Sequence, residues 1–105
     1  MASEQNIQSE CMLALSKIGC MVFRNNTGVL PGHNGRPVKF GLCVGSSDII
    51  GICPDGKFLA VEVKSKRGLA SAAQKRFIGA VALAGGRSGI ARSPKEAVDI
   101  ATGND

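Results

Sequence analysis

Two apolar runs separated by a short turn constrain the fold of this chain more than any other feature. The turn is PDG at 54–56, and it lies between DIIGIC (48–53) and KFLAVEVK (57–64). Pro, Asp and Gly in succession are a strong turn signal, and apolar runs of this length on either side are typical of strands. The sequence therefore predicts an antiparallel hairpin.

The register of this hairpin brings charged side chains together. If Cys53 pairs with Lys57 across the turn, counting back along both strands places Asp48 directly opposite Glu62. Directly opposed residues have Cβ atoms roughly 5 Å apart. Lys64 lies on the same face as Glu62, because side chains alternate along a strand. A one-residue change in the turn would shift this pairing.

Two carboxylates and an ammonium in this arrangement suit phosphodiester hydrolysis. Asp48, Glu62 and the backbone carbonyl of Val63 offer hard oxygen ligands for Mg²⁺ or Mn²⁺. Such a metal stabilises charge on a phosphate and lowers the pKa of a bound water, and Lys64 can orient that water. The alternative is structural, because Glu-x-Lys on a solvated strand is a common surface ion pair and Asp48 can cap a loop.

The flanking sequence predicts helices and further strands around the hairpin. Apolar residues at helical spacing, together with a capping box at SPKE, mark the first and last helices. A stretch dense in Gly, Pro and Asn predicts a loop over 25–37. The other predicted elements are helices at 4–18, 71–84 and 94–101 and strands at 21–24, 39–43 and 88–92. This order predicts one α/β domain over residues 1–105, with a mixed β-sheet flanked by helices.

Charge and composition narrow the classes of partner. Thirteen Lys and Arg against eight Asp and Glu give a net charge of +5, which favours a polyanionic partner. The chain has no Trp or Tyr, so base stacking is not expected to be its main mode of nucleic-acid binding. No Gly-x-x-x-x-Gly-Lys-Ser/Thr run is present, which argues against a nucleotide cofactor.

The cysteines and the N-terminal residues bear on the compartment. The four cysteines, at 11, 20, 43 and 53, form no Cys-x-x-Cys pair, and His33 is the only histidine, so a zinc site is not expected. The first ten residues carry acids and no long apolar run, which predicts no signal peptide. No stretch approaches the length that spans a membrane. We therefore expect reduced, mostly buried thiols, no membrane partner and a cytoplasmic location.

Motifs along the chain, taken in order, resemble those of a nuclease family. GSSDIIG and FLAVEVKSKRG resemble the two core strands of the PD-(D/E)XK nuclease superfamily, and the wider context is similar to its virus-type replication–repair nuclease branch, VRR-NUC. The further matching motifs are EQNIQ (4–8), GCMVFRNNTG (19–28), RPVKFGLCVGSSD (36–48), SAAQKRF (71–77) and AGGRSGIARSPKEA (84–97). Ser47 stands where the family motif has Pro, and the literal PD at 54–55 belongs to the turn.

The resemblance implies a PD-(D/E)XK restriction-endonuclease-like core and roles for particular residues. It implies that Asp48 and Glu62 bind Mg²⁺ or Mn²⁺, that the Val63 carbonyl is a further ligand, and that Lys64 is the catalytic lysine. It matches Glu4 to a helix acid that completes the metal shell, often through water.

Two of these matches have alternatives. Glu10, on the flank of the first helix, is the alternative to Glu4 as the helix acid, and Glu4 itself suits the positive end of the helix dipole. The resemblance places Gln74 beside the active site, but Ser71 and Gln74 also form a Ser-x-x-Gln capping box.

The resemblance also implies a substrate and an assembly. It implies a metal-dependent, structure-specific DNA endonuclease of a bacterial or phage-infected cell that acts on branched DNA, with Holliday junction resolution as the expected activity. It favours a homodimer, and the Ala- and Gly-rich stretch at 79–86 would allow close packing, unless those residues only fit their helix onto the sheet. The alternative function is a non-catalytic DNA-binding or assembly module that retains the nuclease fold. The residues expected to contact nucleic acid are Arg24, Asn26, Arg36, Lys39, Lys66, Arg67, Lys75 and Arg76.

Overall fold

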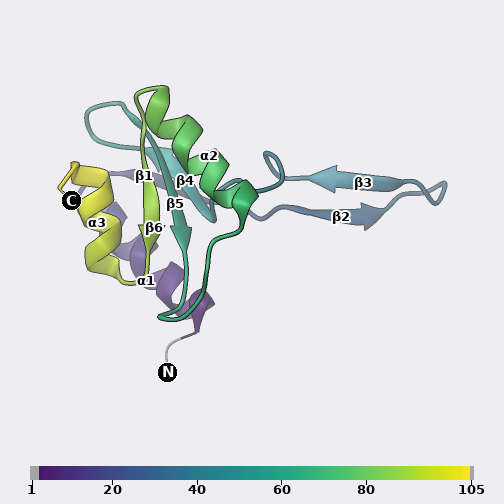
Figure 1. Ribbon diagram of the computed structural model, residues 1–105, viewed down its shortest axis with the longest axis horizontal. Helices are drawn as coiled ribbons and strands as arrows, with labels where there is room; N and C mark the ends of the chain where they lie inside the picture. The colour runs from purple at the N-terminus through teal and green to yellow at the C-terminus, as the bar shows by residue number, and fades with distance from the viewer. Residues whose placement is uncertain (1–2, 105) are drawn as a thin grey trace.

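Strand β5 (Phe58–Val63) lies inside a four-stranded mixed sheet of order β1-β4-β5-β6. The computed structural model describes residues 3–104. β1 (Met21–Arg24) and β4 (Ile49–Ile52) are antiparallel to each other, and β4 is antiparallel to β5. β6 (Arg87–Ala91) pairs parallel to β5, so the chain crosses over the sheet between them (Figure 1).

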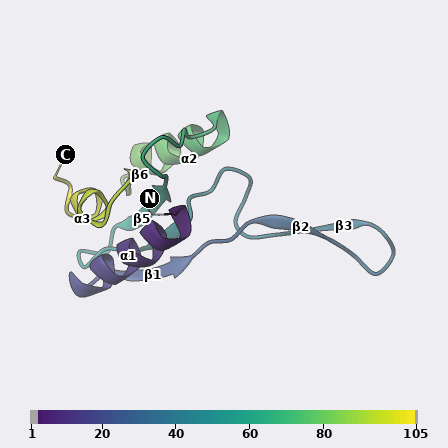
Figure 2. The same ribbon diagram turned by 90° about the horizontal axis from the view of Figure 1, so that it is seen from below.

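Helices cover both faces of this sheet. α1 (Glu4–Lys17) and α3 (Pro94–Thr102) pack together on one face, and α2 (Ala72–Leu83), the crossover helix, lies on the other (Figures 1 and 2). The predicted α/β fold with a mixed sheet flanked by helices is confirmed. Among the described residues, no helix combines the length and the apolar character that crossing a membrane requires.

The alternation of side chains along β5 separates the core from the site. Leu59, Val61 and Val63 are buried among apolar residues of α1 and α3. Glu62 therefore points to the opposite face, toward α2, because successive side chains of a strand point to opposite faces.

The predicted hairpin register is confirmed. The Cys53 N–H donates to the Lys57 carbonyl oxygen at 2.8 Å, and the strand pairing continues to Ile49 opposite Val61. One further step along the same register places Asp48 opposite Glu62. The strands are slightly shorter than predicted, since Asp48 and Cys53 lie just outside β4.

The predicted loop at 25–37 is wrong in part. β2 (Gly28–Pro31) and β3 (Pro37–Phe40) form a separate two-stranded antiparallel sheet, which extends away from the rest of the molecule (Figures 1 and 2). We call residues 28–40 the arm. Pro31 and Pro37 face each other at the end of its ladder, where proline is tolerated. The turn signals mark only its tip, and the strand predicted at 39–43 begins and ends earlier.

The helix caps agree with the sequence except in one detail. Ser71 and Gln74 form the complete predicted capping box at the start of α2. At α3 the Ser93 hydroxyl accepts from the Glu96 N–H at 3.2 Å, but Glu96 Oε1 accepts from the Arg92 N–H at 2.7 Å. In the predicted box at SPKE, the Glu96 side chain would accept from the Ser93 N–H. It accepts instead from the N–H one residue earlier, at Arg92.

Candidate active site

Asp48 is fixed where strand β4 begins. Its Oδ2 accepts a hydrogen bond from the Val63 N–H at 2.9 Å. The carboxylate thus takes the place of a backbone carbonyl that would continue the pairing of β4 with β5. Its own carbonyl oxygen accepts from the Asn25 N–H at 2.7 Å and from Gln8 Nε2 at 3.2 Å. Both neighbouring elements, β1 and α1, therefore hold the Asp48 backbone beside β5.

The Val63 carbonyl points to the same side as Asp48. The N–H and C=O of one strand residue face the same neighbouring strand in an antiparallel ladder. Because the Val63 N–H reaches Asp48 Oδ2, the Val63 oxygen is also directed to the side where β4 has ended. A backbone oxygen and a carboxylate thus lie next to each other.

Glu62 is a buried carboxylate with an unsatisfied oxygen. Its side chain is 1% exposed, and its Oε2 accepts from Gln74 Nε2 at 3.0 Å and lies 3.5 Å from Lys64 Nζ. Its Oε1 is buried and has no hydrogen-bond partner among the described residues. Buried polar atoms are normally paired, so an oxygen left unpaired beside a second carboxylate suits a bound cation.

The ionisation of Glu62 reflects these surroundings. Burial, followed by the charge of Asp48, raises the pKa of Glu62 to about 7, and the Lys64 ammonium opposes this rise. A like charge nearby and burial both disfavour the ionised form of a carboxyl group. A divalent cation would relieve the same repulsion, so the donor set of Asp48, Glu62 and the Val63 carbonyl fits Mg²⁺ or Mn²⁺.

Gln74 makes both of the contacts that its two interpretations require. Its Oε1 accepts from the Ser71 N–H at 2.8 Å, which closes the capping box, and its Nε2 donates to Glu62 Oε2. One amide therefore joins the start of α2 to the buried carboxylate. The two interpretations of the sequence are compatible, because an amide has an acceptor and a donor end.

Glu4 and Glu10 lie in different places. A hollow of about 390 Å³, which we call the site hollow, is lined by Glu4, Gln5, Gln8, Arg24, Asn26, Asp48 and Val63. Glu4 Oε2 also accepts from the Ser65 N–H at 3.3 Å. Glu10 lines a separate hollow with Lys66 and Arg67. The geometry therefore favours Glu4 over Glu10 as the helix acid near Asp48.

Both the sequence and the fold of this chain match known proteins. A family model described as the VRR-NUC domain matches residues 33–95, which is more than half of the chain. The chain belongs to the VRR-NUC family. A solved structure titled "VRR_NUC domain" superposes with a TM-score of 0.63 at 21% identity, covering 94% of this chain and 95% of that one. No curated protein matches the chain. The predicted family is thus confirmed, and the chain is a nuclease-type domain.

A turn that follows β5 of this VRR-NUC domain is held by Arg92. Arg92 Nη1 donates to the carbonyl oxygens of Ser65 at 2.5 Å and Gly68 at 2.7 Å. A side chain at Gly68 would come within 3.0 Å of the Glu4 carboxylate and 3.4 Å of the Lys64 side chain. The turn is therefore packed closely against both site residues. The sequence interpretation missed Arg92, because nothing in the spacing relates it to residues some 25 positions earlier.

Two further residues that support Asp48 were missed as site residues. Gln8 lies inside the EQNIQ motif, which was a usable signal, and it contacts the Asp48 carbonyl. The buried Asn25 donates through Nδ2 to Ser46 Oγ at 2.7 Å and to the Ser47 carbonyl at 2.9 Å. It thereby fixes the chain immediately before Asp48, and only its place in NNTG could have indicated this.

The predicted nucleic-acid residues are not all together. Arg24 and Asn26 line the site hollow, and Arg24 Nη2 is anchored on Ser9 Oγ at 2.8 Å. The others are exposed on three other parts of the domain. Arg36 and Lys39 lie on the arm, Lys66 and Arg67 lie on the turn after β5, and Lys75 and Arg76 lie on α2.

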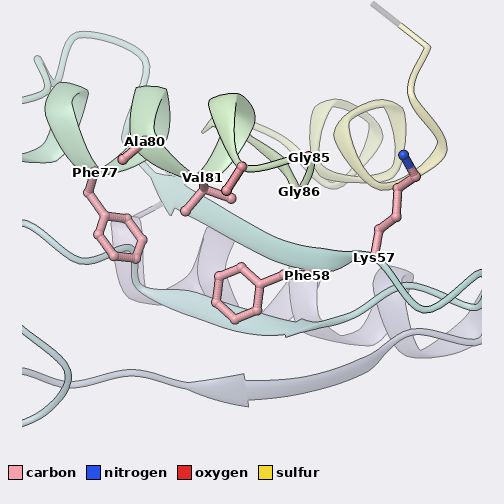
Figure 3. A pocket seen from close by; sticks show the side chains of 8 residues that line it. Lys57, Phe58, Phe77, Ala80, Val81, Gly85 and Gly86 are labelled. Atoms are coloured by element: carbon pink, nitrogen blue, oxygen red, sulfur yellow. The ribbon is translucent and has the colours of Figure 1, made fainter.

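Another hollow, of about 500 Å³, lies away from this chemistry. Phe77 and Val81 of α2 and Phe58 of β5 point into it, whereas Lys57 points away from the rings (Figure 3). Its lining is apolar, and it lies at the Phe58 end of β5, whereas Glu62 lies near the other end. It has no groups for phosphodiester chemistry.

The acidic side chains of the site do not form a cluster of three direct ligands. Within residues 3–104, no group of three or more His, Cys, Asp and Glu side chains is placed to hold a metal ion, so Glu4 does not join Asp48 and Glu62 in such a group. All four cysteines are free, and three are buried, as the sequence predicted; Cys43 is exposed.

A pair of substitutions separates the two functions of Gln74. Gln74→Ala removes one bond of the capping box and the donor to Glu62, whereas Ser71→Ala removes only the other bond of the box, and the loss of an N-cap hydroxyl costs about 1 kcal/mol. We expect similar losses of stability in both proteins, but a loss of cleavage of about 10-fold or more only in Gln74→Ala. Thermal unfolding and cleavage rates on the same preparations test this. Equal cleavage by the two variants would leave Gln74 with a capping role alone.

Proposed function

We propose that this VRR-NUC domain is a metal-dependent, structure-specific DNA endonuclease that hydrolyses phosphodiester bonds in branched DNA, including Holliday junctions. The observation that carries this proposal is the buried Glu62, which lies beside Asp48 and Lys64 and has one oxygen without a partner among residues 3–104. A purely structural ion pair between Glu62 and Lys64 would not need Asp48 as a second carboxylate. A second negative charge beside a buried one raises the free-energy cost of burying the first.

The proposed cofactor is Mg²⁺ or Mn²⁺. Asp48, Glu62 and the Val63 carbonyl would hold it, and Glu4, which lines the site hollow with Asp48, would complete the shell through water. When bound, such an ion stabilises charge on the phosphate and supplies a water of lowered pKa. The protein contributes a rigid donor set, because β4, β5, α1 and α2 each fix part of it.

Lys64 and Gln74 have complementary functions in this proposal. The Lys64 ammonium lies at the Glu62 carboxylate and is mostly buried, with 14% of its side chain exposed. It can orient the attacking water and offset negative charge that develops on the phosphate. Gln74 holds Glu62 Oε2, whereas Oε1 has no hydrogen-bond partner among the described residues and is therefore the oxygen that we propose for the metal.

DNA would contact this domain mainly through its backbone. The eight predicted contact residues are spread over the site hollow, the arm, the turn at 65–68 and α2. The arm and the segments beside it, residues 21–47, contain no acidic residue, so they present only positive charge to phosphates. Phosphate contacts fix position without reading sequence, and this suits recognition of branched shape.

A substrate panel tests this function. End-labelled linear duplexes, flaps, forks and four-way junctions, incubated with pure protein and Mg²⁺ or Mn²⁺, are expected to show cleavage of the branched molecules in preference to the linear duplex. Chelation by EDTA is expected to stop it. Binding of branched DNA without cleavage in either metal would instead favour a non-catalytic DNA-binding or assembly module.

The proposed assembly is a homodimer in the cytoplasm. Resolving a junction requires breaks in two strands, and a two-fold dimer supplies two identical sites. Gly79, Ala80 and Ala82 of α2 are exposed, and Leu83 is 91% exposed, so these small residues do not serve only to fit α2 onto its sheet.

The mass in solution tests the assembly. Light scattering is expected to give twice the chain mass for the wild-type protein and a lower mass for Leu83→Glu, because a charge would be buried in the contact. Paired nicks in a cruciform plasmid are expected from the dimer only. A monomeric wild-type protein that leaves singly nicked plasmid would contradict junction resolution and leave the nuclease proposal standing.

A further inference from the structure

Two buried cysteines face each other at the end of the β1–β4 ladder. Met21 pairs with Ile52 in this antiparallel ladder, so the same register places Cys20 directly opposite Cys53. Both side chains are buried, at 6% and 2% exposed, and both thiols are free. Neither thiol takes part in the site described above.

The ladder gives this pair the closer of its two spacings. The Cys53 N–H donates to Lys57, on the β5 side, and the Cys20 N–H donates to Leu15 in α1. Neither N–H bonds across to the other cysteine, so they form a non-hydrogen-bonded pair. Opposed residues in such pairs have Cα atoms about 4.5 Å apart, which lies within the range that disulfides span.

The Arg87 guanidinium lies close to both thiols. Arg87 is held by Asp55 Oδ2, at 2.8 Å from Nη2, and by the Ala101 carbonyl, at 3.0 Å from Nη1. The Cys53 side chain, ahead of Asp55, raises the pKa of the Arg87 guanidinium. Burial, and then Cys53, raise the pKa of the Cys20 thiol. Arg87 opposes this rise, so its guanidinium favours formation of a thiolate at the pair.

We propose that Cys20 and Cys53 are a redox modification site, at which a hydroperoxide converts the dithiol to a reversible intramolecular disulfide. This goes beyond the proposed nuclease function and does not depend on it. The bond would close a ring around residues 21–52, which hold β1, the arm and β4. It would tie the edge strand β1 to the strand that leads from Asp48.

The reaction balances with hydrogen peroxide as the oxidant. The thiolate of one cysteine attacks one peroxide oxygen, the O–O bond breaks, and the departing hydroxide takes a proton to become water. The other cysteine, after losing its proton, then attacks the sulfur of this sulfenic acid. The S–S bond forms, the S–O bond breaks, and the hydroxide leaves as a second water. Two thiols lose two hydrogens and two electrons, and one peroxide becomes two waters.

Mass spectrometry tests this proposal on the Cys43→Ser protein, which lacks the exposed thiol. After treatment with hydrogen peroxide, we expect the intact mass to fall by two hydrogens, a peptide linking Cys20 to Cys53, and full reversal by dithiothreitol. The melting temperature of the oxidised protein should rise by roughly 10 °C, because the bond restrains the unfolded chain.

Matched variants and a trapping step decide the outcome. Cys43→Ser/Cys20→Ser and Cys43→Ser/Cys53→Ser are expected to show neither the mass loss nor the rise in melting temperature. If either variant does not fold, the linked peptide in the parent protein still decides the matter. Alkylation of both Cys20 and Cys53 after peroxide treatment and denaturation, or further oxidation of Cys53 without a link, would overturn the proposal.

Discussion

Glu62→Gln protein is expected to cleave branched DNA on the order of 1,000-fold more slowly than the wild type while it binds the same DNA with similar affinity. The substitution keeps the size of the side chain and removes the charge that a metal ion needs. Asp48→Asn and Lys64→Ala should cause losses of the same order, because ligands and the water-orienting cation act as a unit.

Single-turnover rates with excess protein are the measurement, since they separate chemistry from binding. Lys66→Ala is the matched control, because it removes a neighbouring positive charge from the turn without touching Asp48 or Glu62. It should weaken DNA binding modestly and leave the bound rate nearly unchanged. Nicking at a near-normal rate by pure Glu62→Gln protein would contradict the assignment of Glu62 to the active site.

The same residue is expected to make the metal-free protein less stable as pH rises. The pKa of Glu62 is about 7 in the folded protein and near 4.5 when unfolded, so the folded state favours the protonated form. Below pH 4.5 both states are protonated and the full stability is present. The contribution of Glu62 to the free energy of unfolding, about 3 kcal/mol, is lost between pH 4.5 and about 7, because the unfolded chain releases its proton first.

Unfolding in EDTA across pH 4–8 tests this for the wild type and Glu62→Gln. The difference in stability between the two proteins should shift by about 3 kcal/mol in favour of Gln over that window. Added Mn²⁺ should recover stability for the wild type at pH 8, because the metal binds the ionised pair. Parallel pH profiles for the two proteins would show that ionisation of Glu62 does not destabilise the folded protein.

The position of Asp48 opposite Glu62 was predictable from the sequence because one turn determines it. PDG at 54–56 sets the register of β4 and β5, and the register alone brings Asp48 opposite Glu62. Gln74 was ambiguous in sequence for a physical reason, since an amide can cap a helix and bind a carboxylate at once. The choice between Glu4 and Glu10 needed three-dimensional structure, because both lie on the same helix and only packing directs one toward Asp48.

The arm and the support from Arg92 were beyond local reasoning. Glycine and proline at 28–37 are typical of turns, and they predict a loop here. In the structure, the residues on either side of the tip pair as β2 and β3, in a sheet that is separate from the four-stranded sheet. Arg92 serves the site through carbonyl oxygens of the turn at 65–68, and backbone acceptors leave no trace in a sequence.

Equilibrium binding of Mn²⁺, followed by electron paramagnetic resonance on the preparations used for cleavage, tests the central claim most directly. The wild-type protein should bind Mn²⁺, and its cleavage rate should rise with occupancy. Asp48→Asn and Glu62→Gln should lose binding and cleavage together, whereas Lys64→Ala should keep binding and lose cleavage. Unchanged Mn²⁺ binding in both carboxylate variants, or cleavage by the wild type in EDTA, would contradict a metal-dependent nuclease site at Asp48 and Glu62.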